Sequence, residues 1–175
     1  MAEPASDASL VAAARAGDRD AFGRLYERYG RMVHGILLAR VPRYDVADLV
    51  HDVFLSALRQ LGTLREDGAF GGWLSTIARR CAVDHLRRSP EETAIPEDLP
   101  GADPGRNDGR WVLRTIRSLP EAYRETLILR LVEGMTGPEI AARTGLTPGS
   151  VRVNLHRGMK QLREKLGLTA LEPER

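Results

Sequence analysis

Basic side chains recur at helical spacing near the C-terminus, where residues 143–165 hold six basic residues and one acidic residue. Arginine can donate paired hydrogen bonds to guanine, and a small apolar side chain can contact the methyl group of thymine. At 100° per residue, one side of a helix in this window carries these groups together. That side consists of Arg152, Val153, His156 and Lys160, with Arg157 beside it. The pattern favours a helix that enters the major groove of DNA over a solvated basic helix.

A second basic face lies on a helix expected from about residue 70 to Arg88. Cations near a helix C-terminus also stabilise the helix dipole, so a purely structural role is an alternative. This helix carries four arginines, Arg79, Arg80, Arg87 and Arg88, which is more than helix capping needs. We therefore interpret the face as a further contact for nucleic acid. Its members within about 100° of one another are Thr76, Arg79, Arg80, Val83 and Arg87.

Carboxylates form a stripe on the amphipathic helix expected over residues 45–61. Helical geometry places Asp45, Asp48 and Asp52 on the side opposite the apolar face, with Leu55 among them. An apolar residue ringed by charges is typical of a protein interface in which the charges steer a basic partner. A solvated face is the alternative interpretation.

Residues that could support catalysis or bind a metal are sparse. The one cysteine, Cys81, excludes an intramolecular disulfide and any zinc site built from several cysteines, and we expect it to be a core residue. His34, His51 and His85 show no ligand spacing, and no nucleotide-binding loop is recognisable. We therefore expect no enzyme, no cofactor, no metal and no small-molecule substrate.

The composition, with 42% hydrophobic and 29% charged residues, is that of a soluble globular protein. No segment is apolar enough to span a bilayer, and the first 17 residues lack the pattern of a signal sequence. Together with the single cysteine, this predicts a cytoplasmic protein without membrane insertion.

The chain divides around a segment, residues 89–110, that is rich in proline and glycine and carries six acidic residues against two basic ones. Apolar residues that could anchor it are scarce, so we predict a flexible linker with an r.m.s. span of about 26 Å. Both flanking blocks show helical periodicity and no sustained strand-like alternation. The sequence therefore predicts an all-α protein with two small helical domains, 1–88 and 111–175, that can sit far apart.

The C-terminal block contains a helix-turn-helix pattern. Thr136 and Glu139 form a capping box, Gly145 ends the short helix that follows, and Thr147-Pro148 begins the next one. Ahead of the motif we expect a helix that starts near Pro120 and ends at Gly134. We expect its apolar face to consist of Leu127, Ile128, Leu131 and Val132.

Four segments, in this order and separation, resemble the extracytoplasmic-function (ECF) sigma factors of the sigma-70 family. They read DVADLVHDVFLSAL, FGGWLSTIARRCAVDHLRR, LPEAYRETLILRLVEGMTGPEIAARTGL and TPGSVRVNLHRGMKQLREKL. The resemblance covers roughly residues 9–166 and includes the two-domain layout of a σ2 helical bundle and a σ4 helix-turn-helix domain. It implies a non-catalytic subunit that binds bacterial core RNA polymerase and promoter DNA, with an anti-sigma factor as regulator.

The resemblance also assigns roles to the three surfaces. In σ2, Asp48, His51, Asp52 and Leu55 would dock on core polymerase, and the loop from about Leu61 to Phe70 would hold a flipped minus 10 base. The minus 10 DNA would face Phe70, Thr76, Arg79, Arg80, Val83 and Arg87. In σ4, the minus 35 groove would receive Arg152, Val153, His156, Arg157 and Lys160.

The chain departs from the family pattern at three places. Arg80 stands where many members have asparagine, and His51 and Asp52 replace a commoner glutamine and glutamate. Phe70 is the single aromatic residue near the minus 10 loop, so melting would depend on pocket fit more than on a stacking platform.

Two other functions fit parts of the sequence. An autonomous helix-turn-helix regulator would bind a palindromic operator as a dimer without polymerase. A helical adaptor without a DNA role is disfavoured by the basic face of the last helix.

Overall fold

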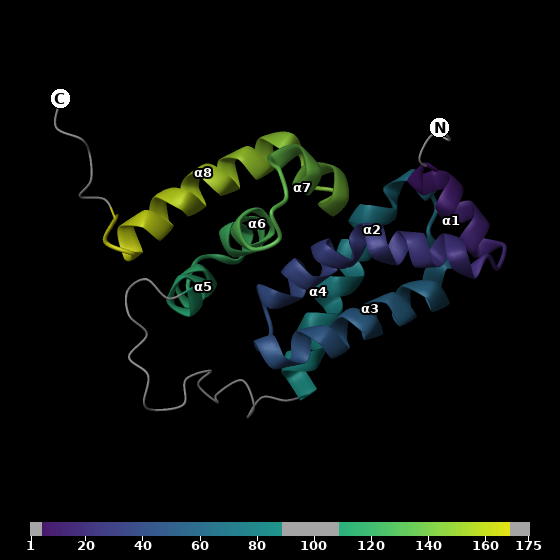
Figure 1. Ribbon diagram of the computed structural model, residues 1–175, viewed down its shortest axis with the longest axis horizontal. Coiled ribbons are helices and arrows are strands. Elements are labelled where there is room, and N and C mark those ends of the chain that lie inside the picture. The colour runs from purple at the N-terminus through teal and green to yellow at the C-terminus, as the bar shows by residue number, and fades with distance from the viewer. Residues whose placement is uncertain (1–4, 89–108, 169–175) are drawn as a thin grey trace.

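A computed structural model describes residues 5–88 and 109–168, and the predicted linker lies almost entirely outside these residues. The described chain is helical and contains no strand, which confirms the all-α prediction for this part of the chain. Helices α1 to α4 form an N-terminal bundle and α5 to α8 a C-terminal bundle (Figure 1). Gly109 and Arg110, which the sequence placed in the linker, are the first residues of α5.

The N-terminal bundle is built around α2, which the other three helices of the bundle contact. Its helices are α1 (Asp7–Arg15), α2 (Arg19–Leu38), α3 (Val46–Gln60) and α4 (Phe70–Arg88), with 3-10 turns at Arg43–Asp45, Leu61–Thr63 and Asp67–Ala69. Asp18 begins α2, because its carboxylate accepts hydrogen bonds from the backbone N–H groups of Asp20 and Ala21. Most of the apolar face predicted for α3 is buried, with Val53 and Phe54 in the core, but Leu58 is 47% exposed near the end of the helix.

The C-terminal bundle consists of α5 (Gly109–Arg117), α6 (Glu121–Leu131), α7 (Gly137–Thr144) and α8 (Pro148–Lys165). The predicted capping box is present: Thr136 accepts from the Glu139 N–H, and the Glu139 carboxylate accepts from the Thr136 N–H at 2.8 Å. Gly145 ends α7 with φ of +76°, in the left-handed region that glycine adopts without strain. The helix-turn-helix prediction is thus met in its local geometry.

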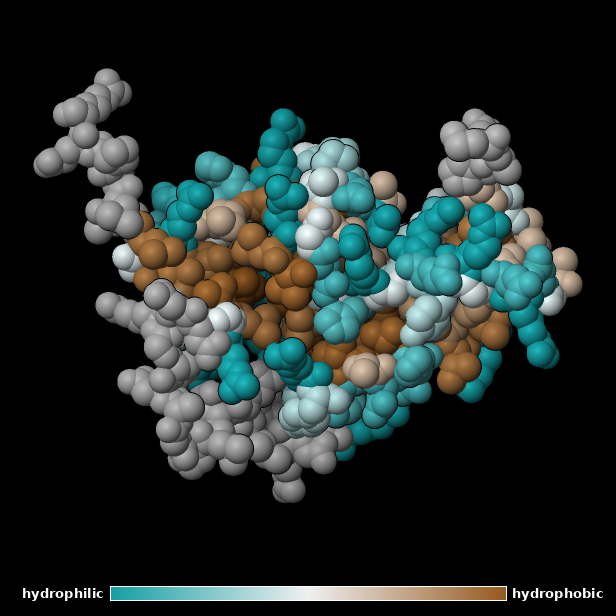
Figure 2. Space-filling model, viewed as in Figure 1, coloured by the Kyte–Doolittle hydropathy of each residue, from teal (hydrophilic) through white to brown (hydrophobic). Residues whose placement is uncertain are grey.

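The end of α6 differs from the prediction. The helix stops at Leu131, and Leu131 and Val132 are about half exposed instead of lying on the apolar face. Leu129 is fully buried in their place, because its side of α6 packs against α2. Figure 2 shows hydrophobic residues gathered on the surface between α5, α6 and α8.

The two bundles pack directly against each other through α6 and α7 on one side and α2 and α4 on the other (Figure 1). Ser75 in α4 donates a buried hydrogen bond of 3.0 Å to the carbonyl oxygen of Thr144 in α7. Arg143 Nη1 donates to the carbonyl oxygen of Arg28 at 2.9 Å, and Arg117 Nε donates to that of Leu38 at 3.0 Å. The arrangement is therefore closed, although the sequence also allowed the bundles to sit far apart.

Candidate partner and nucleic-acid interfaces

The acidic stripe lies on the exposed side of α3. Asp48, His51 and Asp52 are exposed, and Leu55 keeps 50% of its surface accessible. The Tyr26 hydroxyl lies 3.3 Å from His51 Nδ1 and links the stripe to α2. The four residues that the sequence placed at a partner interface thus share one accessible surface.

Asp45 is engaged differently from the rest of the stripe. Its carboxylate pairs with His85 Nε2 at 2.9 Å, and both side chains are mostly buried. This pair ties the turn before α3 to the last third of α4. Asp45 therefore helps to position the stripe.

The acidic stripe and the basic face of α4 share a groove between α3 and α4. Asp52 and Leu55 line it from α3, while Arg80 and Cys81 line it from α4. Burial raises the pKa of the Cys81 thiol, and the neighbouring carboxylates of Asp52 and Asp84 raise it further. The thiol is therefore held in its protonated, less reactive form, as expected of a packing residue.

Most of the basic face of α4 is accessible. Thr76, Arg80, Val83 and Arg87 are exposed, and Val83 keeps 42% of its surface accessible. The Thr76 hydroxyl donates to the Gly72 carbonyl oxygen of the preceding turn at 3.1 Å. Four of the six residues assigned to minus 10 DNA thus form one outward face.

Phe70 does not belong to that face. It is fully buried, with its ring centroid 5.2 Å from that of Tyr29 and 5.8 Å from that of Trp73. An aromatic ring in this position packs the start of α4 onto α2, and its burial leaves no ring face for a DNA base. Phe70 is therefore a core residue in this structure, and its role at minus 10 DNA stays a prediction.

Arg79 is engaged with the C-terminal bundle. Its Nε and Nη2 donate to the two carboxylate oxygens of Glu125 in α6 at 3.1 and 2.7 Å. Arg40, which follows α2, lies 2.6 Å from the same carboxylate and also pairs with the exposed Glu121. Two arginines from one bundle thus hold one carboxylate of the other.

Glu125 is only 4% exposed, so its ionisation depends on these partners. Burial by itself raises its pKa, but the hydrogen bonds and charges of Arg79 and Arg40 outweigh this effect and leave the pKa below its ordinary value. The hydrogen bond to Glu125 in turn raises the pKa of Arg79. No charge pattern in the sequence singled out Glu125. Its place three residues before the buried Ile128 could have indicated a charge on the packed side of α6.

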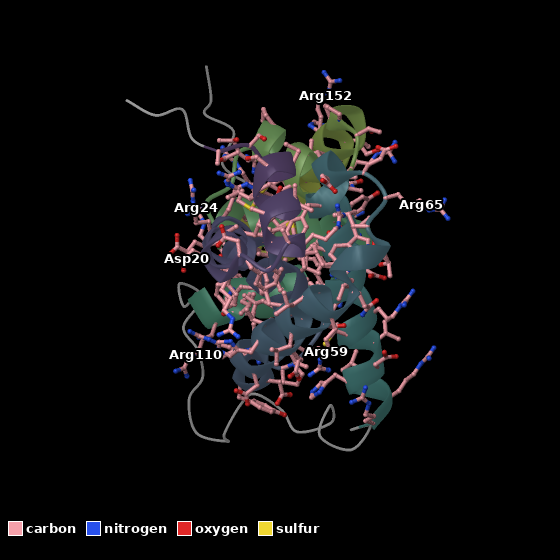
Figure 3. All side chains as sticks on the ribbon, turned by 90° about the vertical axis from the view of Figure 1, so that its right-hand side faces the viewer. Asp20, Arg24, Arg59, Arg65, Arg110 and Arg152 are labelled. Carbon is pink, nitrogen blue, oxygen red and sulfur yellow. The ribbon has the colours of Figure 1, made fainter. Side chains whose placement is uncertain are left out.

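The basic face of α8 is open. Arg152, Val153, His156, Arg157 and Lys160 are all exposed. Arg152 points away from the body of the molecule (Figure 3). The opposite side of α8 packs on α6, where Gly158 allows close approach to Tyr123 and Leu127. All five predicted residues therefore face the same way.

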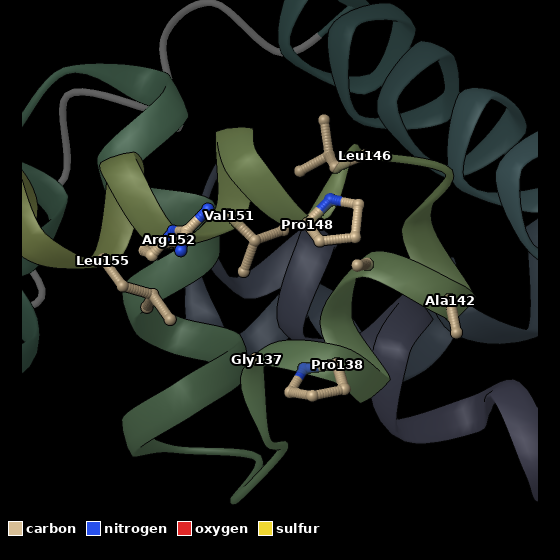
Figure 4. Close-up of a pocket in the computed structure, with 9 residues that line it drawn as sticks. Gly137, Pro138, Ala142, Leu146, Pro148, Val151, Arg152 and Leu155 are labelled. Atoms are coloured by element: carbon tan, nitrogen blue, oxygen red, sulfur yellow. The ribbon is translucent and has the colours of Figure 1, made fainter.

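An apolar groove runs between the two helices of the helix-turn-helix motif (Figure 4). Pro138 and Ala142 line it from α7, Leu146 from the turn, and Pro148, Val151 and Leu155 from α8. Arg152 lies at its edge. The turn thus places the first basic residue of α8 beside the groove.

Within the described ranges, no helix is long and apolar enough to cross a membrane. In the same part of the chain, no group of histidine, cysteine, aspartate and glutamate side chains could hold a metal ion.

Helix-turn-helix geometry with an exposed basic second helix is typical of a DNA-binding protein. Comparisons with known proteins show to which family of DNA-binding proteins this chain belongs. Residues 25–90 match sigma-70 region 2, and residues 109–162 match sigma-70 region 4. The chain also matches ECF RNA polymerase sigma-E factors at more than 30% identity over 95% of its length, and it belongs to the ECF sigma factors of the sigma-70 family.

Two curated relatives illustrate the extent of the similarity. RNA polymerase sigma factor CarQ of Myxococcus xanthus is 36% identical, over 92% of this chain and 98% of its own. The ECF RNA polymerase sigma-E factor of Escherichia coli K12 is 33% identical, over 95% of this chain and 97% of its own.

Two solved structures share the fold. CnrH in complex with the cytosolic domain of CnrY has a TM-score of 0.62 and 26% identity, over 94% of this chain and 99% of that one. The sigma factor RpoE of Bartonella quintana, in complex with the anti-sigma factor NepR, has a TM-score of 0.59 and 20% identity, over 86% and 99% of the respective chains.

Proposed function

We infer that this chain binds bacterial core RNA polymerase and directs it to promoters that carry separate minus 35 and minus 10 elements. The observation that carries this function is the match of regions 2 and 4, in order, to two bundles that each present an accessible charged face. The chain would contribute binding and positioning, while the polymerase carries out the chemistry in the cytoplasm.

Residues 1–88 act as the σ2 domain. The stripe of Asp48, His51, Asp52 and Leu55 docks on a basic helix of the polymerase, because an apolar anchor among carboxylates complements such a partner. Phosphates and bases of the minus 10 element are contacted by Thr76, Arg79, Arg80, Val83 and Arg87. Phe70 supports this surface from the core.

Residues 111–175 act as the σ4 domain, which α5 extends to Gly109. The exposed face of α8 enters the major groove of the minus 35 element, with Arg152 and Val153 nearest its N-terminus. Residues 89–108 connect the two domains. Tethering two weak DNA modules raises the overall affinity through their effective concentration.

A partner protein of the anti-sigma class regulates access to these surfaces. Support comes from two structures of similar fold, RpoE in complex with the anti-sigma factor NepR and CnrH in complex with the cytosolic domain of CnrY.

A selection experiment tests this function and defines the promoter sequence at the same time. Core polymerase, with and without the chain, is incubated with a library of random DNA duplexes, and the retained duplexes are sequenced. We expect enrichment only when both proteins are present, and an asymmetric site made of two separated elements. A palindromic site selected by the chain alone would support an autonomous regulator instead.

Arg152→Ala is expected to weaken use of the upstream element by about 1 to 3 kcal/mol, because one good arginine–guanine pair contributes that much discrimination. Binding competition between duplexes with intact and scrambled upstream elements measures this, at constant salt. The control is Arg163→Ala, which removes an exposed arginine from the other end of α8. Unchanged preference in Arg152→Ala would exclude the residue from base recognition.

A further inference from the structure

Helix α1 ends beside the loop that joins α3 to α4, residues 61–69. Arg15, the last residue of α1, extends its side chain to this loop. Its Nη2 atom donates a hydrogen bond of 3.0 Å to the carbonyl oxygen of Leu64 and lies 2.8 Å from the Asp67 carboxylate. One guanidinium group therefore holds the loop at two points, one on the backbone and one on a side chain.

The two points belong to separate turns of the loop. The N–H group of Leu64 closes the first turn, Leu61–Thr63, by donating to the carbonyl oxygen of its first residue at 3.3 Å. The last N–H group of the second turn, Asp67–Ala69, donates to the carbonyl oxygen of Glu66 at 2.9 Å. Arg15 therefore joins the end of the first turn to the start of the second.

Two polar side chains lie between the points that Arg15 holds. Arg65 and Glu66 are exposed, and Arg65 points away from the body of the molecule (Figure 3). A base that has left the helical stack is recognised through hydrogen bonds to its Watson–Crick edge. The Arg65 guanidinium offers donors and the Glu66 carboxylate offers acceptors for such an edge. Their directions depend on the short stretch of backbone that Arg15 fixes at both ends.

Helix α1 gives Arg15 a rigid support. The apolar side of the helix packs in the core, where Val11 is fully buried. At the first turn of the helix, Arg28 and Tyr29 of α2 both donate hydrogen bonds to the Asp7 carboxylate. Because its position is fixed at the opposite end, α1 can transmit the order of the bundle to the loop.

The contact is too exposed to serve mainly as a source of stability. The side chains of Arg15 and Asp67 keep 36% and 27% of their surface accessible. Ion pairs at such positions contribute little to the free energy of unfolding, because water screens them. A cation in the last turn also stabilises the helix dipole, but that effect needs no partner in the loop. A role in shaping the loop accounts for both contacts.

We propose that Arg15 is a positioning residue for promoter recognition, which holds the loop so that Arg65 and Glu66 select the flipped minus 10 base. This inference rests on the proposed function of the loop as the pocket for that base. Arg15 acts through the loop and does not itself contact the base. Its loss therefore changes which base is accepted, while folding and polymerase binding are retained.

Two variants break the contact from its two sides. Arg15→Ala removes the guanidinium, and Asp67→Asn removes the charge of its carboxylate partner and leaves the hydrogen bond to Leu64 in place. The matched control is Arg24→Ala, an exposed arginine of α2 that lies on the opposite side of the molecule from Arg65 in Figure 3. Thermal unfolding and a pull-down with core polymerase verify that each variant folds and binds the enzyme.

The first measurement is amide hydrogen exchange in the free, full-length chain. We expect residues 61–69 to exchange about fivefold faster in Arg15→Ala, which is the change expected from the loss of one hydrogen bond of ordinary strength. Asp67→Asn should show a smaller increase, and Arg24→Ala none. Unchanged exchange in Arg15→Ala would overturn the positioning role, and it would leave the sigma function intact.

The second measurement is the base preference of the polymerase complex at each position of the minus 10 element. Duplexes built on the site selected in the function test carry each of the four bases at one position and compete for the complex at fixed salt. We expect Arg15→Ala to lower the preference at a single position by about fivefold or more and to leave the other positions unchanged. The double variant Arg15→Ala, Asp67→Asn should lose no more than Arg15→Ala, because both changes break the same contact.

Three results would contradict this expectation, and they have different meanings. Unchanged preference at every position would overturn the positioning role of Arg15. An equal loss of affinity for all duplexes would also overturn it, because a phosphate contact by Arg15 weakens binding to every sequence alike. Failure of the parent complex to select a two-part site would overturn the sigma function itself.

Discussion

The double variant Asp52→Arg, Leu55→Arg is expected to lose stoichiometric binding to core RNA polymerase, with at least a hundredfold loss of affinity. Truncating an apolar anchor at the centre of an interface costs about 2 kcal/mol or more, and placing like charges against a basic partner adds further repulsion. Together these effects exceed the roughly 2.7 kcal/mol that a hundredfold change requires. A pull-down from nuclease-treated samples measures the binding and excludes bridging by DNA.

A matched control separates the stripe from a general effect of charge. Glu27→Arg, Leu168→Arg makes the same change in net charge at two exposed positions outside α3. We expect this control to bind polymerase like the parent chain. Equal losses in the two double variants would mean that binding depends on overall charge and not on the stripe.

Local features of the fold were predictable because their determinants are neighbours in the sequence. The capping box needs only Thr136 and Glu139, and the end of α7 needs only a glycine that can adopt a positive φ. The same reasoning places the five basic-face residues of α8 on one side, since a helix of known pitch fixes their directions. These predictions do not depend on what packs against the helix.

Contacts between distant segments were not predictable from spacing alone. Arg79 has the helical position of a DNA-contacting residue, but its direction is set by Glu125, which lies 46 residues later. Leu131 and Val132 fit an apolar face by spacing, yet α6 ends there and leaves them exposed. A residue of another helix decides the environment of Arg79, and the end of α6 decides that of Leu131 and Val132. The roles in polymerase and DNA binding stay predictions.

Phe70→Ala is expected to lower the free energy of unfolding of the N-terminal bundle by about 3 to 5 kcal/mol. Removing a fully buried phenylalanine loses its transfer free energy and leaves a cavity, and here it also removes the ring contacts with Tyr29 and Trp73. Urea unfolding followed by Trp73 fluorescence, in a Trp111→Phe background, measures the loss. Val83→Ala on the exposed face of the same helix should change stability by no more than about 0.5 kcal/mol.

Phe70→Leu distinguishes a core residue from a base-stacking one. Leucine refills most of the lost volume, so we expect a cost of about 1 to 2 kcal/mol and near-normal transcription at temperatures where the bundle stays folded. Leucine has no π face, so a phenylalanine that stacks on a flipped base would lose function in this variant even though the protein stays folded. Normal transcription by Phe70→Leu would mean that the shape and polar groups of the loop between α3 and α4 hold the flipped base. Loss of transcription by a folded Phe70→Leu variant would mean that Phe70 leaves the core when DNA binds.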